Sequence, residues 1–307
     1  MIRLDGVRKV FRSDFLRRKK EVLRGLSFHV ERGETYALLG ENGAGKTTTM
    51  KILLGLVRAD GGSAMIGGIS STNPESRRGL GFLPEHPYFL PHLTGEELVR
   101  YYGRLSGLSA REASAATDRL LARVRLESAR ARRIRTYSKG MLQRLAFAQA
   151  LVADPEVLVL DEPLSGLDPV GRKEMRELLL DLKRRGTTIL FSSHIIEDVE
   201  KLADRAGFLT DGAIGLEADG EGNERIEVFA EGVDAEAVAA AAIEAERIAN
   251  EGERLLITLR SERDLPRLRD RLRSRGGRIV RVEKRRETLE DLFVENILSR
   301  PGARDPV

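Results

Sequence analysis

A glycine-rich segment near the amino terminus carries the residue types that hold a phosphate chain. Its spacing, G-x-x-x-x-G-K-T, is filled by Gly40, Glu41, Asn42, Gly43, Ala44, Gly45, Lys46 and Thr47. Glycines let successive backbone N–H groups face a β-phosphate at the positive end of a helix dipole. Lys46 would reach the β- and γ-phosphates, Thr47 would coordinate Mg²⁺, and Thr48 would join the nucleotide contacts. The segment therefore predicts an ATP site, with a chance glycine-rich turn as the alternative.

A second chemical signal is an acidic pair that follows the apolar run at residues 157–160. Asp161 would hold Mg²⁺ through water, and Glu162 is placed to accept a proton from the water that attacks ATP. Taken alone, the pair could be only the polar end of a strand. Together with the glycine-rich segment it predicts the other half of a nucleotide-hydrolysing site.

Strands that alternate with helices must position these side chains. We expect strands at residues 2–11, 25–30, 34–40, 157–160 and 188–192, and helices at residues 46–56, 96–105, 110–124, 141–152, 172–185 and 195–203. The runs at 34–40 and 157–160 are apolar enough for burial on both faces. This alternation predicts an α/β fold with a mostly parallel sheet covered by helices on both sides.

A shift in composition at residues 220–223 marks the start of a second domain. Beyond it we expect strands at residues 225–230, 253–260 and 278–283, and helices at residues 235–248, 265–275 and 289–298. The helix at 265–275 is basic and amphipathic, which favours packing on its own domain, with contact to lipid headgroups as the alternative. The predicted domains are residues 1–216, with a helical region at about 94–150, and a small α+β domain at residues 222–300.

Three further segments carry a family resemblance. The first, Tyr137-Ser138-Lys139-Gly140-Met141-Leu142-Gln143-Arg144, resembles the signature loop of ABC-type ATPases, in a variant with Lys and Met at the usual second Gly and Gln. Ser165 to Asp168 resembles the D-loop of that family, and His194 matches its switch histidine. In order and spacing the set resembles the ATP-binding subunit of an ABC transporter over residues 1–215. The resemblance implies a P-loop NTPase core with an ABC-type β subdomain and a helical subdomain.

The resemblance also implies a head-to-tail homodimer that forms with ATP. Each ATP would lie between the glycine-rich loop of one subunit and Ser138, Gly140 and Met141 of the other, with Lys46, Glu162 and His194 acting in catalysis. Taken singly, Ser138 could be only a helix N-cap, and His194 only a polar residue that starts a helix. Phe11 stands where the family places an aromatic ring against adenine, and a core phenylalanine that closes the first strand is the alternative.

One position departs from the broad family, because Glu85 stands where a glutamine is usual. A carboxylate can ligate Mg²⁺, yet its charge opposes the γ-phosphate unless metal lies between them. The segment around Glu85, the signature variant and the carboxyl-terminal domain together resemble a branch of bacterial exporter ATPases. That branch implies a transmembrane permease subunit encoded as a separate chain, and a peripheral position on the cytoplasmic face of the cell membrane.

The composition narrows the remaining function classes. Lys and Arg total 52 against 48 Asp and Glu, and a net charge of +4 is small for a dedicated nucleic-acid binder, so no nucleic-acid partner is expected. The chain has no cysteine, which excludes disulfides, thiolate zinc sites and iron–sulfur clusters. Its longest apolar runs are far shorter than the roughly 18 residues that cross a bilayer. The alternative function is a soluble ABC ATPase that acts in DNA repair or translation. Repair ATPases carry long coiled coils or zinc-binding cysteines, and ribosome-acting ATPases usually carry two cassettes. Neither pattern is found in this sequence.

Overall fold

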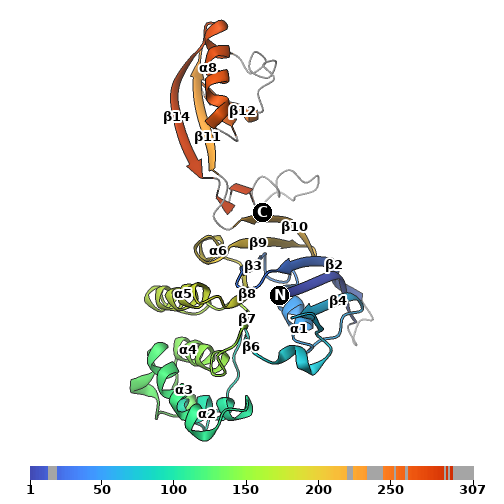
Figure 1. Cartoon of the computed structure of the whole chain (residues 1–307), viewed down its shortest axis with the longest axis vertical. Coiled ribbons are helices and arrows are strands. Elements are labelled where there is room, and N and C mark those ends of the chain that lie inside the picture. The colour runs from blue at the N-terminus through green and yellow to red at the C-terminus, as the bar shows by residue number, and fades with distance from the viewer. Residues whose placement is uncertain are drawn as a thin grey trace. The chain divides into compact units, whose positions relative to one another are not determined.

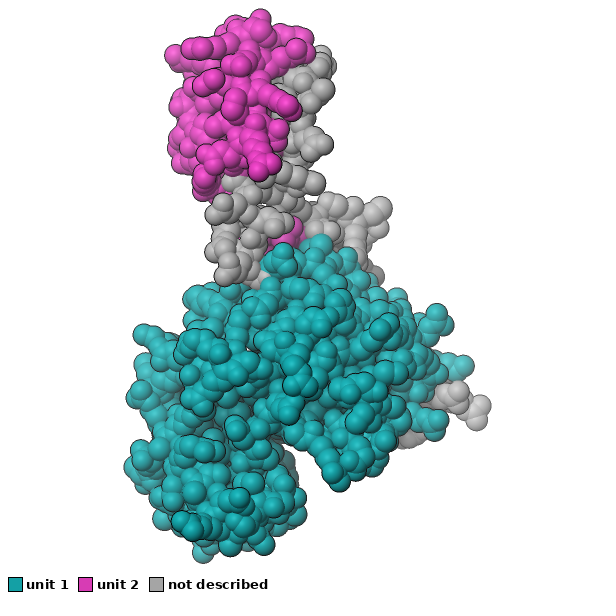
Figure 2. Space-filling view, viewed as in Figure 1, with its two compact units in different colours: residues 1–220 teal, residues 221–307 magenta. Residues whose placement is uncertain are grey.

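The computed structural model describes residues 1–12, 19–219, 224–233, 245–251, 254–259, 262–286, 288–289 and 291–292. The chain divides into two compact units, residues 1–220 and residues 221–307 (Figure 2). Each unit has a hydrophobic core of its own. Within the described residues, no helix is both long and apolar enough to cross a membrane.

The first unit is built on two sheets. An antiparallel sheet has the order β2-β1-β4-β5, with bounds Lys19–Val30, Ile2–Arg12, Gly61–Ile66 and Ile69–Ser70. The larger sheet has the order β10-β9-β3-β8-β7-β6, with bounds Ala213–Asp219, Arg205–Thr210, Thr35–Leu39, Thr188–Ser193, Val157–Leu160 and Leu80–Leu83. Its strands are parallel except β10, which runs antiparallel to β9. Every residue of β3, β7 and β8 is buried, as expected for apolar strands covered on both faces.

Helices cover both faces of the six-stranded sheet (Figure 1). On one side lies α1 (Lys46–Leu53), whose Met50, Ile52 and Leu53 share a core with the antiparallel sheet. On the other side lie α4 (Lys139–Ala150), α5 (Pro169–Arg184) and α6 (Ile196–Leu202). The helix predicted at residues 46–56 ends earlier in the structure, at Leu53. The helix predicted from residue 172 begins earlier, at Pro169, because Asp168 caps it and proline is favoured at the first position of a helix.

The helical region adds α2 (Gly95–Leu105) and α3 (Ala110–Arg123), which contact each other and α4. Each begins with a capping box, Thr94 with Glu97 and Ser109 with Glu112. Hydrogen bonds at these caps lower the pKa of both glutamates. The main cause is the bond with the Thr94 backbone for Glu97 and the bond with the Ser109 side chain for Glu112. Short 3-10 helices complete the described first unit at Pro74–Arg77, Glu127–Ala129 and Ile134–Thr136.

The second unit holds an antiparallel sheet of order β12-β13-β11-β14, with bounds Ala245–Glu251, Arg254–Leu259, Glu224–Glu231 and Arg278–Arg286. A 3-10 turn (Glu262–Asp264) leads into α8 (Leu265–Ser274), which buries Leu268 and Leu272 against the sheet core. The basic helix thus packs on its own domain, as predicted.

One predicted helix of this unit is wrong in its described part. Residues 245–248 belong to β12 and pair with β13, so a strand stands where alanine-rich composition favoured a helix. Residues 235–244 of that prediction lie outside the described residues. Of the predicted helix at 289–298, Leu289, Asp291 and Leu292 are helical, and the remainder lies outside the described residues.

Candidate functional site

Four parallel strands bring the glycine-rich loop, the acidic pair, Glu85 and His194 to one edge of the sheet. β3 leads into the glycine-rich loop, β8 into His194, β7 into Asp161 and Glu162, and β6 into the loop that carries Glu85. Paired residues near the strand ends fix this meeting point, because Leu39 lies opposite Ser193 and Leu83 lies opposite Leu160. The carboxyl ends of parallel strands are the usual place for a ligand in such a sheet.

The glycine-rich loop requires glycine for two separate reasons. A Cβ atom on Gly40 would lie 2.5 Å from the carbonyl oxygen of Leu209, so there is no room for a side chain. Gly43 and Gly45 adopt φ values of +90° and +115°, which disfavour L side chains. Gly45 is the N-cap of α1 and offers no side chain to the first N–H groups of that helix. The loop therefore combines an uncapped helix start with close backbone packing, which suits a phosphate group.

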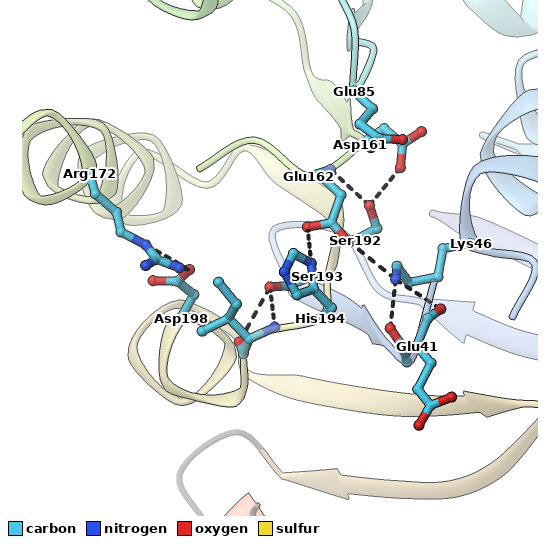
Figure 3. Close-up of polar contacts among 12 residues, drawn as sticks. Glu41, Lys46, Glu85, Asp161, Glu162, Arg172, Ser192, Ser193, His194 and Asp198 are labelled. Atoms are coloured by element: carbon cyan, nitrogen blue, oxygen red, sulfur yellow. Dashed lines mark hydrogen bonds and ion pairs between the residues drawn. The ribbon is translucent and has the colours of Figure 1, made fainter. Parts of the chain in front are cut away.

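Lys46 joins this loop to the acidic strand end. Its side chain is 6% exposed, and Nζ donates to the carbonyl oxygens of Gly40 at 2.6 Å and Glu41 at 3.3 Å. The same ammonium lies 3.2 Å from Oε1 of Glu162 (Figure 3). A buried cation thus stands between the loop and the candidate base.

Glu162 has an unusual backbone, and its carboxylate lies beside the Lys46 ammonium and the His194 imidazole. Its φ is +48°, in the left-handed region that non-glycine residues rarely adopt, and its N–H donates to Ser192 Oγ at 2.8 Å. Oε2 lies 2.9 Å from Nδ1 of His194, whose side chain is 44% exposed while that of Glu162 is 9% exposed. The structure therefore brings together Lys46, Glu162 and His194, all three of the residues predicted for catalysis.

Ser192 is a site residue that sequence reasoning missed. It is fully buried on β8, and its hydroxyl donates to Oδ1 of Asp161 at 2.7 Å while its oxygen accepts the N–H of Glu162. One side chain thus orients both members of the acidic pair. The available signal was the serine pair that ends an apolar strand directly before His194.

The donor set fits Mg²⁺ with few protein ligands. Asp161 is 2% exposed, and its N–H donates to the Leu83 carbonyl at 2.8 Å, which ties it to the end of β6. Across the described residues, no three His, Asp or Glu side chains form a metal cage. Magnesium commonly binds one or two carboxylates together with substrate phosphates and water. Thr47 in the first turn of α1 and Asp161 have the oxygen chemistry for this, and Glu85, with its side chain 44% exposed, follows the end of β6.

The predicted signature loop lies elsewhere in the single chain. Ser138 is the N-cap of α4, and its Oγ accepts the N–H of Met141 at 3.2 Å, so the N-cap interpretation describes its contact within one subunit. Gly140 and Met141 form the first turn of α4, which lies on the opposite face of the sheet from α1 (Figure 1). Within one chain, the helix that follows the glycine-rich loop and the helix that begins at the signature loop therefore lie on different faces of the sheet.

Two further features involve residues predicted for the site. A cavity of about 230 Å³ is lined by Glu162 and His194 together with the D-loop segment Ser165, Gly166 and Leu167. Phe11 on β1 is 43% exposed, with the ammonium of Lys9 5.3 Å from its ring centre. The alternative of a buried core phenylalanine is therefore wrong, and stacking on adenine stays a prediction.

The α/β fold and the lysine-bearing glycine loop beside a buried acidic pair define a P-loop ATPase. Residues 23–165 match a family described as "ABC transporter", and residues 220–297 match "ATP-binding protein DrrA1-3-like, C-terminal domain". An uncharacterized ABC transporter ATP-binding protein of Synechocystis sp. is 40% identical over 313 residues, covering 96% of this chain and 84% of the relative. The chain belongs to the family of ABC transporter ATP-binding proteins, and it is an ATPase.

Two other relatives bear on function and fold. Nod factor export ATP-binding protein I of Burkholderia lata is 44% identical over 195 residues, which cover 63% of this chain and 64% of that protein. A solved ATP-binding cassette, described as a dimeric post-hydrolysis state bound to ADP and Pi, has a TM-score of 0.66 and 24% identity. The alignment covers 71% of this chain and 98% of that cassette, and it establishes the likeness of fold.

Proposed function

We propose that this chain is the ATP-hydrolysing subunit of an exporter whose membrane subunit is a separate chain. The observation that carries the proposal is the chain of contacts from Lys46 through Glu162 to His194. Export is supported by the name of the Burkholderia relative, and the alternative in DNA repair or translation has no support among these relatives. The subunit then works at the cytoplasmic face of the membrane, held there by its partner.

The contacts of Lys46 suggest how substrate prepares the base. The γ-phosphate of ATP competes with Glu162 for the ammonium, because both are anions within reach of the same buried cation. Once the Lys46 ammonium contacts the γ-phosphate instead of Glu162, the Glu162 carboxylate is free to accept a proton from the attacking water. His194 holds the other oxygen of that carboxylate and so fixes the direction in which the base points. Thr47 and Asp161 would hold Mg²⁺, which would neutralise charge on the phosphate oxygens.

The signature loop supports a two-subunit site. Ser138, Gly140 and Met141 begin α4, and that helix lies on the opposite face of the sheet from α1. A second copy arranged head to tail would place these residues on the ATP of the first. The solved cassette of similar fold is a dimer. ATP then favours the closed dimer through contacts that exist only in that state, and hydrolysis removes them.

The test combines the base with the dimer. Glu162→Gln keeps the size of the side chain but removes its basicity, so ATP should bind and turnover should fall by about 10²–10⁴-fold. Light scattering with ATP and Mg²⁺ should then detect a lasting dimer that Ser138→Arg abolishes. Ser106→Arg, an exposed serine that caps the end of α2, is the matched control and should leave the dimer intact. Normal turnover in Glu162→Gln, or a dimer indifferent to Ser138→Arg, would refute the proposal.

A further inference from the structure

The helix that carries the signature loop is bonded directly to the segment that follows the candidate base. Gln143 on α4 is 4% exposed, and its Nε2 donates to the carbonyl oxygen of Pro163 at 2.8 Å. Pro163 is the residue next to Glu162, whose own backbone is held in the left-handed region. A buried amide that has this acceptor is a strong positional restraint, because losing the partner leaves a polar group unsatisfied.

A second contact joins the two loops. A Cβ atom on Gly166 would lie 2.5 Å from Cε and 3.0 Å from Nζ of Lys139, so the lysine side chain lies directly on this glycine. Gly166 has a φ of +74°, and a Cβ on Gly140 would lie 3.8 Å from Cδ2 of Leu167. The lysine that departs from the usual signature sequence therefore rests on the D-loop of its own subunit.

An ion pair also connects α4 to α5. Nη2 of Arg144 lies 2.8 Å from Oε2 of Glu174, with side chains 16% and 14% exposed, and Nη1 donates to the Val124 carbonyl at 3.2 Å. Three successive contacts, from Lys139, Gln143 and Arg144, thus connect α4 with residues 163–174. These contacts form a continuous packed and hydrogen-bonded path from the start of α4 to the backbone beside Glu162.

We propose that Gln143, assisted by Lys139, is a positioning residue that couples the two ATP sites of the dimer. This inference rests on the proposed function, in which the signature loop of one subunit touches the ATP held by the other. Ser138 to Met141 then respond to the partner's ATP, and Gln143 passes that response to Glu162, which serves the ATP of its own subunit. Binding at one site thereby favours the active position of the base at the other, which is a coupling free energy between sites.

The experiment measures ATP hydrolysis by the full chain against ATP concentration. The wild type should give a Hill coefficient clearly above 1 and at most about 2, the upper limit being the number of coupled sites. Gln143→Met removes the amide donor at similar size and should bring the coefficient to about 1 and lower kcat by about three- to tenfold. ATP affinity, measured by equilibrium binding, should remain within about twofold, because Gln143 is not among the nucleotide contacts.

Two companion variants keep the test decisive. Gln149→Met makes the same change on the same helix and should behave as the wild type. Lys139→Ala alters an exposed side chain, so it is expected to fold even if Gln143→Met does not, and it should also lower the Hill coefficient. A cooperative wild type with unchanged cooperativity in the Gln143 and Lys139 variants would overturn this inference alone. A wild type without cooperativity would also overturn this inference. The absence of an ATP-dependent dimer in Glu162→Gln would overturn the proposed function and this inference with it.

Discussion

Glu162 shares its two carboxylate oxygens between His194 Nδ1 at 2.9 Å and Lys46 Nζ at 3.2 Å. The histidine follows β8 and the lysine starts α1, so this one side chain links two strand ends of the sheet. The base therefore begins the proposed cycle in contact with the cation that ATP needs. In the proposed function, ATP binding would also release the base, because the same ammonium would bind either the Glu162 carboxylate or the γ-phosphate.

Lys46→Ala should separate this role from folding. Loss of a buried hydrogen-bonding cation typically costs about 1.5–3 kcal/mol, so ATP affinity should fall by about 10- to 100-fold, and turnover should be lost. The matched control is Lys51→Ala, which removes an exposed lysine from the last turn of the same helix. Nucleotide titration and circular dichroism provide the measurement. Unchanged affinity with a native spectrum would show that the glycine-rich loop does not bind the phosphates.

Ser192→Ala should impair hydrolysis more than ATP binding. The change removes the donor to Asp161 and the acceptor for the Glu162 N–H, and buried groups left without a partner cost about 1–3 kcal/mol of stability. The control is Thr117→Val, since Thr117 is also fully buried and its hydroxyl donates to the Ala113 carbonyl within α3. Both variants should melt earlier, but only Ser192→Ala should lower kcat. Equal turnover in the two would reduce Ser192 to a structural residue.

Local motifs made most of the site predictable from the sequence. The glycine-rich loop and the acidic pair each lie within a few residues of an apolar run, so their chemistry and their strand can be identified together. Ser192 could not be found in this way. Its bonds to Asp161 and Glu162 exist only because β8 lies beside β7, and that order is a property of the whole sheet.

The elements that were missed or wrong depend on tertiary contacts in the same way. In β9, Gly207 occupies a strand interior, where glycine is normally unfavourable, because the hydroxyl of Tyr36 fills the space of its side chain. In β12, residues 245–248 pair with β13, and this pairing overrides the helix preference of an alanine-rich segment. Neither neighbour can be identified from a short window of sequence.

Glu85 variants should show whether the unusual carboxylate acts near the metal. Glu85→Gln keeps the shape and one oxygen ligand, so we expect hydrolysis to be retained. Glu85→Ala removes both carboxylate oxygens. This change should lower turnover and raise the Mg²⁺ concentration that hydrolysis requires, with a modest effect on ATP affinity. His86→Ala is the neighbouring control, because the two side chains lie 3.9 Å apart and are both exposed. Wild-type rates at every Mg²⁺ concentration in Glu85→Ala would exclude a role near the metal.

The last prediction concerns where the first unit can be cut. Tyr36 is fully buried on β3, and its hydroxyl donates to Oε1 of Glu217 on β10 at 2.5 Å. Burial is the main cause that raises the pKa of Tyr36, and the hydrogen bond to Glu217 raises it further, so the hydroxyl remains a donor. Glu217 also accepts from Arg205 at 3.2 Å, while Arg205 donates to Glu34 at 2.8 Å. The last strand before the second unit is therefore part of the polar network of the central sheet.

A chain that ends at Asp219 should keep this network and all the described contacts of the candidate site, so we expect it to fold and to hydrolyse ATP. A chain that ends at Leu216 lacks Glu217 and leaves the Tyr36 hydroxyl unsatisfied, which should cost about 1–3 kcal/mol and lower the melting temperature. In the full chain, Glu217→Ala should reproduce that loss, whereas Glu217→Gln, which keeps an acceptor, should recover much of it. Thermal melting and ATPase assays compare the four proteins. Equal melting of the two shortened chains would contradict the role of Glu217. A folded chain ending at Asp219 that binds ATP without hydrolysing it would show that the second unit is needed for the chemistry.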